Sequence, residues 1–169
     1  DKCMHVKEKA SEIMVILEVM RSHLYRAEHN AKIDQYGNMT PDFEPLNAAR
    51  NWFPKMYQRM NEIIKILGAS GLMALPTEAD FSNDDVGSLV HRYTQGANIN
   101  GEERVQLFRL GWDISISAFG NRQALYEYYF FGDPVRMSNA YYDSFNKQPY
   151  KDTVTSFLNR AKKEAGILS

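Results

Sequence analysis

Apolar residues that recur three and four positions apart run through most of this chain, and this period restricts its fold more than any other feature. The spacing matches one face of an α-helix, whereas a half-buried strand would alternate apolar and polar residues. It is clearest in residues 3–31, where a heptad pattern comprises Val6, Ala10, Ile13, Leu17, Met20, Leu24, Ala27 and Ala31. A second apolar face at the middle of this segment is formed by Met14, Val15, Ile16 and Val19. A helix that is apolar on two sides is expected to be covered on two sides, inside a bundle or between subunits.

The same pattern predicts further helices along the chain. Residues 44–68 form the second, which Gly68 ends and which Pro54 bends or locally breaks. The others are expected at about 82–93, capped by Ser82, at 101–131, from Pro134 onward, and at 150–165, ended by Gly166. A turn at 34–42, an extended loop at 69–81 and a turn at 96–101 connect them. No segment alternates strongly enough for a strand, so we predict an all-α helical bundle in which residues 1–169 form a single domain.

Composition narrows the class of protein. A net charge of −1 gives no electrostatic case for binding nucleic acid or an anionic membrane. No apolar run approaches the ~20 residues of a membrane span, and no signal peptide is recognised. The single cysteine, Cys3, rules out an internal disulfide and suits a reducing compartment, so a cytoplasmic location is expected. Because the chain begins at Asp1 without an initiator methionine, it is either processed or a piece of something longer.

Metal and nucleophilic chemistry find little support in the sequence. Helical di-iron proteins use Glu-x-x-His pairs, and none of the four histidines has a Glu three residues before it. The pattern therefore predicts no metal site. Asp113 has two interpretations, a buried carboxylate with a shifted pKa or the partner of Arg109 in a salt bridge across one helical turn, and the second is favoured.

Two segments rich in small residues are candidates for holding a phosphate-bearing ligand. In the first, a glycine-containing step inside a predicted helix precedes an arginine and a glutamine, and its residues are Ser117, Ala118, Phe119, Gly120, Arg122 and Gln123. A glycine inside a helix costs about 1 kcal/mol relative to alanine, so either close helix packing or a cofactor should compensate. An arginine offers a fixed fork of donors to a phosphate, which favours the cofactor.

The second segment follows the helix at 44–68 and comprises Gly68, Ser70, Gly71 and Leu72. Its ordinary interpretation is a helix C-cap followed by a loop, because glycine is expected there whatever the function. Its functional interpretation is a close approach of the backbone to a nucleotide-type cofactor. A run of aromatic residues over several helix faces is separately expected to form an oligomer interface: Tyr126, Tyr128, Tyr129, Phe130 and Phe131.

Longer blocks of sequence resemble a known family. Residues 67–81, the blocks at 95–98 and 102–110, and residues 117–134 closely resemble the C-terminal domain of the 4-hydroxyphenylacetate 3-monooxygenase large component. The same family includes a pyoverdine-chromophore hydroxylase and, more distantly, 4-hydroxybutyryl-CoA dehydratase. The resemblance covers nearly the whole chain. It implies the helical-bundle fold of acyl-CoA dehydrogenase C-terminal domains and a parent protein about three times as long.

The resemblance also implies an activity, that of a two-component flavin monooxygenase. A separate NAD(P)H-dependent flavin reductase would supply FADH2, and the large component would form a flavin hydroperoxide and hydroxylate a phenolic substrate next to its hydroxyl group. Catalytic residues are expected in the missing N-terminal and middle domains, so none is assigned to this chain. Its own expected roles are to hold FAD and to build the core of a homotetramer, a dimer of dimers.

Residue by residue, the resemblance carries FAD binding to both small-residue segments, and Arg122 is the expected partner of the pyrophosphate. Two alternatives remain open. The chain could be a purely structural assembly domain of the same enzyme, with FAD held elsewhere. It could also belong to a dehydratase of the 4-hydroxybutyryl-CoA type, whose iron–sulfur ligands would lie upstream because this chain has one cysteine.

Overall fold

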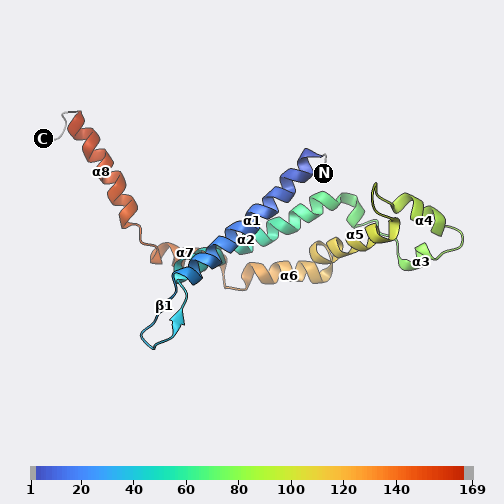
Figure 1. Cartoon of the computed structure of the whole chain (residues 1–169), viewed down its shortest axis with the longest axis horizontal. Helices are drawn as coiled ribbons and strands as arrows, with labels where there is room; N and C mark the ends of the chain where they lie inside the picture. Colours follow the sequence, from blue (N-terminus) through green and yellow to red (C-terminus); the bar gives the residue numbers. More distant parts are fainter. Residues whose placement is uncertain (1–2, 166–169) are drawn as a thin grey trace. The chain divides into compact units, whose positions relative to one another are not determined.

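The computed structural model describes residues 3–165, and these confirm the all-α prediction (Figure 1). In chain order the elements are α1 (Met4–His29), β1 (Lys32–Ile33), β2 (Met39–Thr40), α2 (Phe43–Gly68), the 3₁₀ turn η1 (Ala69–Leu72), α3 (Glu78–Phe81), α4 (Gly87–Thr94), α5 (Gly101–Ser115), α6 (Ala118–Tyr129), α7 (Pro134–Ser144) and α8 (Gln148–Glu164). The chain forms two compact units, one ending at Pro134 and the other beginning at Val135.

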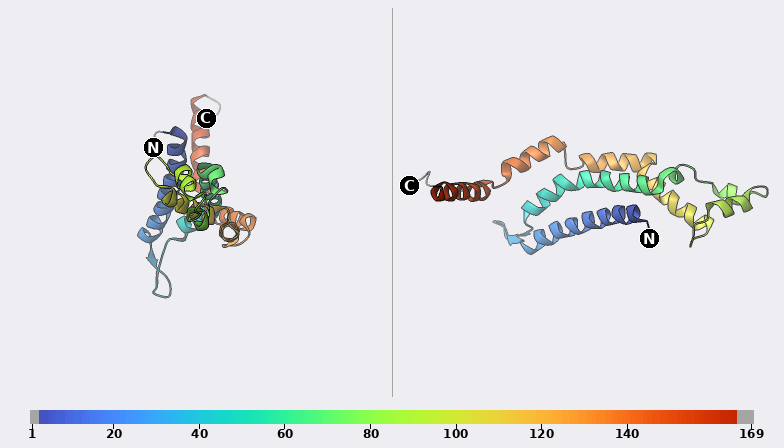
Figure 2. Two further views of the ribbon diagram at one scale, coloured as in Figure 1. Left: turned by 90° about the vertical axis from the view of Figure 1, so that its right-hand side faces the viewer. Right: turned by 90° about the horizontal axis from the view of Figure 1, so that it is seen from above.

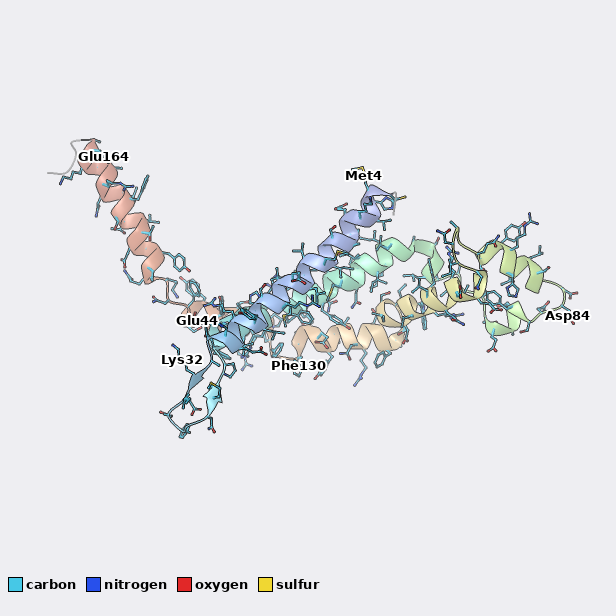
Figure 3. All side chains as sticks on the ribbon, viewed as in Figure 1. Met4, Lys32, Glu44, Asp84, Phe130 and Glu164 are labelled. Carbon is cyan, nitrogen blue, oxygen red and sulfur yellow. The ribbon has the colours of Figure 1, made fainter. Side chains whose placement is uncertain are left out.

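The long helices α1 and α2 lie antiparallel and form the body of the first unit (Figure 2). Ile16 and Ala27 of α1 and Ala49 and Ile63 of α2 are buried. An ion pair reinforces the packing, because the guanidinium of Arg59 donates to both carboxylate oxygens of Glu12 at 2.5 and 2.9 Å. This contact holds the pKa of Glu12 below its ordinary value. At the other end of the two helices, Arg26 of α1 forms an ion pair with Glu44. Glu44 lies where α2 begins (Figure 3).

Two sequence predictions for this region are wrong in detail. Residues 34–42 do not form a simple turn, because β1 and β2 pair as a short antiparallel hairpin just before α2. The carboxylate of Asp34 organises this hairpin by accepting from the backbone N–H groups of Tyr36 and Asn38, and the bond from Asn38 is the main reason that its pKa is lowered. The second error is the local break at Pro54, since α2 continues through this residue.

The second apolar face of α1 is exposed only in part within the first unit, because Ile16 is buried and Val19 is half-buried. Met14 is 63% and Val15 is 62% exposed, and they line a shallow groove together with Glu18, Val19, Ser22 and His23. The helix packs on α2, and within the first unit Met14 and Val15 stay uncovered. A cover for that face stays a prediction.

The predicted helix at 101–131 is two helices, and this is the largest correction to the sequence analysis. α5 ends at Ser115, Ile116 and Ser117 leave the helical path, and α6 begins at Ala118. Ser117 has an extended backbone with ψ at 162°, and its hydroxyl accepts from the N–H of Gly120 at 2.9 Å. This is N-cap geometry, so the serine that looked like part of a small helical step starts a new helix.

The segment between α2 and α5 also differs from prediction. Residues 69–81 hold η1 and α3 rather than an extended loop, and Ser82 is the C-cap of α3 rather than the N-cap of a following helix. α4 begins at Gly87 instead, because the Asn83 side chain accepts from the N–H groups of Asp85 and Val86 and closes a turn there. A Cβ on Gly87 would lie 2.5 Å from the carbonyl oxygen of Phe81, so the close return of the chain requires glycine.

α7 begins at Pro134, as predicted, and continues into the second unit. There α8 leaves its apolar side chains exposed: Tyr150, Val154, Phe157 and Leu158. The predicted stop at Gly166 lies outside the described residues. Across residues 3–165 no helix is long and apolar enough to cross a membrane.

Candidate cofactor-binding segments

The start of α6 presents backbone and side-chain donors at one place. The first N–H groups of a helix have no partner within the helix, and they carry the positive end of the helix dipole. Ser117 satisfies the N–H of Gly120, which leaves those of Ala118 and Phe119 as the donors at this end. Both residues are exposed, Phe119 to 62%. The geometry is that of a helix N-terminus open to an anion.

Gly120 holds this helix start against the end of α5. A Cβ there would lie 2.5 Å from the carbonyl oxygen of Ile114 and would also collide with that of Asp113. Close helix packing therefore compensates for this glycine, which is one of the two explanations that the sequence left open. Glycine here positions the helix start and is itself buried.

Arg122 and Gln123 follow on the next turn of α6. Arg122 is exposed, which leaves its guanidinium able to reach a ligand beyond the helix start. Gln123 is half-buried, and its amide donates to the carboxylate of Glu127 at 2.7 Å. The structure therefore ties Gln123 to its own helix and keeps Arg122 on the surface.

The second segment, Gly68 to Leu72, connects the end of α2 to the turn η1, which packs on α5, and is called the glycine joint below. Leu72 is 3% exposed, and its Cδ1 lies 2.7 Å from where a Cβ of Gly68 would stand. A Cβ on Gly71 would lie 2.6 Å from Cε1 of Phe108 in α5. The left-handed residue after the helix is Ala69, with φ at 46°, and Ser70 is exposed. Both glycines thus admit protein side chains, whereas Ser70 remains available to a ligand.

Both segments adjoin the same helix. η1 packs on α5 around Phe108, and the start of α6 follows the end of α5 after Ile116 and Ser117. The two segments therefore share one support, although they contact different parts of it.

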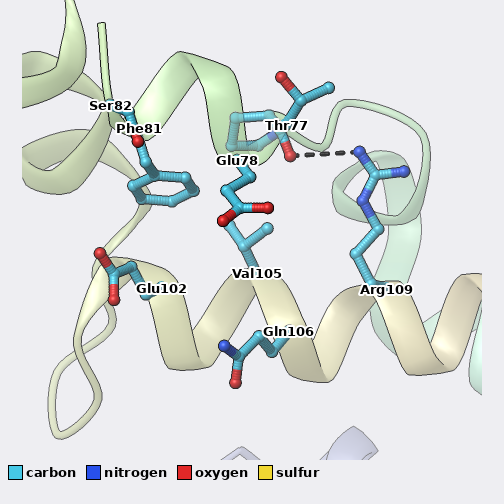
Figure 4. Close-up of a pocket in the computed structure, with 9 residues that line it drawn as sticks. Thr77, Glu78, Phe81, Ser82, Glu102, Val105, Gln106 and Arg109 are labelled. Carbon is cyan, nitrogen blue, oxygen red and sulfur yellow. Dashed lines mark hydrogen bonds between the residues drawn. The ribbon is translucent and has the colours of Figure 1, made fainter.

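A pocket that the sequence analysis missed opens between the segment around α3 and helix α5 (Figure 4). Its volume is about 730 Å³, and its lining comprises Pro76, Thr77, Glu78, Phe81, Ser82, Glu102, Val105, Gln106 and Arg109. Arg109 closes one side by donating to the carbonyl oxygens of Leu75 and Pro76, each at 3.1 Å. The favoured salt bridge between Arg109 and Asp113 is therefore not what orients Arg109. The lining combines two stretches of sequence about 20 residues apart, so no local sequence motif predicts the pocket.

Metal chemistry gains no support from the structure. Among residues 3–165, no group of three or more His, Cys, Asp and Glu side chains is placed to hold a metal ion. His91 approaches Glu102 at 3.7 Å and packs edge-on against Phe81, which is a surface contact between α4, α3 and α5. What the site offers chemically is anion binding by N–H groups, a serine hydroxyl and a guanidinium.

These features define an all-α domain in which a helix start, with first N–H groups that have no partner in the helix, and the segment Gly68 to Leu72 adjoin the same helix, α5. The family model described as "4-hydroxyphenylacetate 3-hydroxylase C terminal" matches residues 1–159, and the chain belongs to this family. This confirms the resemblance drawn from the sequence blocks.

Individual relatives agree with the family. The oxygenase component of 4-hydroxyphenylacetate 3-monooxygenase from Geobacillus sp. (strain PA-9) is 65% identical over 158 residues, which cover 94% of this chain and 32% of the relative. A crystal structure of an oxygenase component (HpaB) complexed with FAD and 4-hydroxyphenylacetate superposes with a TM-score of 0.89 at 48% identity, over 95% of this chain and 34% of that one. This chain thus spans about a third of the length of these relatives.

A 4-hydroxybutyryl-CoA dehydratase from N. maritimus has the same fold, with a TM-score of 0.77 over 99% of this chain and 32% of that one. Its identity is 19%, so this likeness concerns the fold alone.

Proposed function

We propose that this chain is the C-terminal part of the oxygenase component of a two-component, FADH2-dependent aromatic hydroxylase, where it helps to hold FAD and to assemble the oligomer. The observation that carries the proposal is the match, at 48% identity and a TM-score of 0.89, to an oxygenase component crystallised with FAD and 4-hydroxyphenylacetate. The proposed reaction places a hydroxyl group next to the existing hydroxyl of a phenolic substrate. A separate flavin reductase is the proposed partner.

The residues at the start of α6 fit the pyrophosphate of a flavin dinucleotide. A pyrophosphate carries negative charge and several acceptor oxygens, and exposed N–H groups at Ala118 and Phe119 supply matching donors. The guanidinium of Arg122 adds a charge-assisted donor pair on the same side of the helix start. The exposed hydroxyl of Ser70 is the proposed contact from the glycine joint, while Gly68, Gly71 and Leu72 shape that joint.

The chain's own residues would bind and orient the cofactor. When bound, reduced FAD would supply the oxygen-activating chemistry, which side chains do not provide. Ser117 and Gly120 fix the helix start against α5, so the donors are held in place before the ligand arrives. Preorganised donors of this kind lower the cost of ordering on binding.

The exposed aromatic run is the proposed oligomer interface. Within the first unit Tyr126, Tyr129 and Phe130 are each more than half exposed, at 52, 53 and 53%. Neighbouring rings stack edge-on or tilted, with centroids 5.2 Å apart for Tyr126 and Phe130. Aromatic side chains of this size dominate subunit contacts, and a homotetramer built as a dimer of dimers is the proposed assembly.

The test of the activity uses the full-length protein with FAD, NADH, a flavin reductase and 4-hydroxyphenylacetate. Formation of the catechol product would support the hydroxylase. Absence of product, together with iron in the protein and turnover of a hydroxybutyryl thioester, would replace it by the dehydratase.

The test of the binding role is Arg122→Ala in the same full-length protein. FAD retention should fall about tenfold or more, because a charge-assisted pair to a phosphate contributes about 1.5–3 kcal/mol. Arg21→Ala is the matched control, since Arg21 is an exposed helical arginine paired with Glu18 on α1. Equal retention in both variants would favour the purely structural assembly domain.

A further inference from the structure

Three polar residues in the described part of the chain are buried. They are Asn61, Ser115 and Ser117, with exposed fractions of 5, 2 and 5%. The two serines flank the break between α5 and α6, and the asparagine belongs to α2. Burial of a polar group is unfavourable unless it is hydrogen-bonded, so each of the three needs a partner.

The two serines have partners at the break. The hydroxyl of Ser115 donates to the carbonyl oxygen of Gly111 at 2.6 Å, and that of Ser117 donates to the carbonyl oxygen of Asp113 at 2.7 Å. Each hydroxyl has one hydrogen and two lone pairs, so Ser115 keeps capacity to accept. The Nδ2 of Asn61, in contrast, is buried and has no hydrogen-bond partner among the described residues.

The position of Asn61 on α2 directs it to this break. Three residues before it, the amide of Gln58 donates to the carbonyl oxygen of Ala124 in α6 at 2.6 Å. Three residues after it, Cγ2 of Ile64 lies 3.7 Å from where a Cβ of Gly111 in α5 would stand. Residues three apart share a helix face, so Asn61 faces the stretch between Gly111 and Ala124. That stretch contains Ser115 and Ser117, and α2 runs beside α5 and α6 (Figures 1 and 2).

We propose that Asn61 binds a buried water molecule at the break between α5 and α6. The water accepts from Nδ2 of Asn61 and donates to the hydroxyl of Ser115 and to a carbonyl oxygen at the end of α5. Buried waters make about three such bonds and are found where buried polar groups would otherwise lack a partner. At the end of α5 the carbonyl oxygens of Trp112 and Asp113 already accept from Ile116 and Ser117, so those of Ile114 and Ser115 are the acceptors proposed for the water.

The bound water joins the long helix α2 to the end of α5, on which Gly120 packs the start of α6. This gives Asn61 a positioning role that rests on the proposed function, because the start of α6 carries the donors assigned to the flavin pyrophosphate. Asn61 itself is buried and acts through the water and the helix break. Its loss should loosen the first turn of α6 before it affects anything else.

The experiment compares the full-length protein with its Asn61→Leu variant by hydrogen–deuterium exchange of the amides of Ala118 to Asn121 and by FAD release. The proposal expects exchange at these amides to become about tenfold faster and FAD release to accelerate, because leucine leaves the water or its acceptors unpaired. Asn61→Ser, which keeps a small polar group and room for water, should restore part of the protection. Lys55→Leu is the control, since Lys55 is an exposed residue of the same helix α2.

The outcomes separate the water from the flavin. Unchanged or slower exchange in Asn61→Leu would overturn the proposal, because replacing an amide that truly lacks a partner removes a desolvation cost. Faster exchange with unchanged FAD release would support the water and overturn the positioning role of Asn61. A crystal structure of the full-length protein with no water within hydrogen-bond distance of Nδ2 would also overturn the site.

Discussion

Gly120 of α6 faces the carbonyl oxygen of Ile114 in α5 so closely that a Cβ at this position would lie 2.5 Å from the oxygen. Two helix ends that read as one helix in the sequence are thereby pressed together at backbone distance. The contact sets where the first N–H groups of α6 point, and with them the donors proposed for the flavin.

Replacing Gly120 by alanine should therefore loosen the junction of α5 and α6. The clash is with backbone atoms that cannot rotate away, so we expect a loss of about 1–3 kcal/mol despite the better helix propensity of alanine. Thermal unfolding of the full-length protein and hydrogen exchange at the start of α6 measure this. Gly111→Ala is the control, because its Cβ would meet only side-chain atoms, the nearest being Cδ2 of Leu72 at 3.2 Å. Equal destabilisation by both changes would contradict the special role of Gly120.

Gly71→Ala should displace Phe108 and weaken the joint between η1 and α5. A Cβ would lie 2.6 Å from Cε1 of the ring, and the ring also carries the guanidinium of Arg104 over its face at 4.7 Å. We expect a loss of about 1–3 kcal/mol, as for other overpacked sites. The measurement is hydrogen exchange over residues 69–75. Ser70→Ala at the exposed neighbour should leave this exchange unchanged, and a comparable increase there would refute the packing explanation.

The ion pair between Glu12 and Arg59 should make the packing of α1 on α2 sensitive to acid. Hydrogen bonds from Arg59 lower the pKa of Glu12 in the folded protein, so the folded state prefers the carboxylate. The resulting stability is present above the ordinary glutamate pKa and is lost as the pH falls through the lowered value. Glu12→Gln should thus lower the melting temperature at pH 7, and the difference from wild type should shrink as the pH falls below the ordinary glutamate pKa.

The control for that comparison is Glu18→Gln, because Glu18 pairs with Arg21 on the surface of α1 alone. Its pH-dependent effect should be smaller, as exposed pairs within one helix contribute little. A gap between wild type and Glu12→Gln that persists unchanged into acid would argue against the carboxylate as its cause.

The short helix α3 should depend on its capping box. The Thr77 hydroxyl accepts from the N–H of Asp80, and the Asp80 carboxylate accepts from the N–H of Thr77 at 2.6 Å, which lowers the pKa of Asp80. Thr77→Ala should cost about 1 kcal/mol locally, while Thr77→Ser should retain the cap. Faster exchange over 78–82 in the alanine variant alone would support this. Because Thr77 also lines the pocket beside Arg109, the same variants test whether α3 shapes that pocket.

Hydrophobic period and composition predicted most elements of the fold. The helices at Met4–His29, Phe43–Gly68 and Gln148–Glu164 lie within a few residues of their predicted bounds, because long amphipathic stretches specify helix locally. The predictions failed where side chains redirected the backbone. Ser117 caps a new helix, and Asn83 closes a turn that moves the start of α4 from Ser82 to Gly87.

The candidate site divides in the same way. Small residues and Arg122 marked the start of α6 in the sequence. Which glycines pack against other protein atoms, however, depends on residues that are distant in the chain. Gly71 meets Phe108, and no spacing rule links positions 37 residues apart in a loop and a helix. Asn61 gave no signal at all, because an asparagine on an amphipathic helix is ordinary until its burial is known.

By itself the sequence determined the helical class, the main helices and, through its longer blocks, the family, since all of these depend on local period and on residue identity. Only the tertiary structure decided that the helix predicted at 101–131 is two helices, α5 and α6. It also showed that Gly120 allows close packing of α6 on the end of α5, and that Asn61 of α2 is buried. The physical reason is that burial and close backbone approach arise between segments far apart in the chain, where the excluded volume of one segment decides what the other can accommodate.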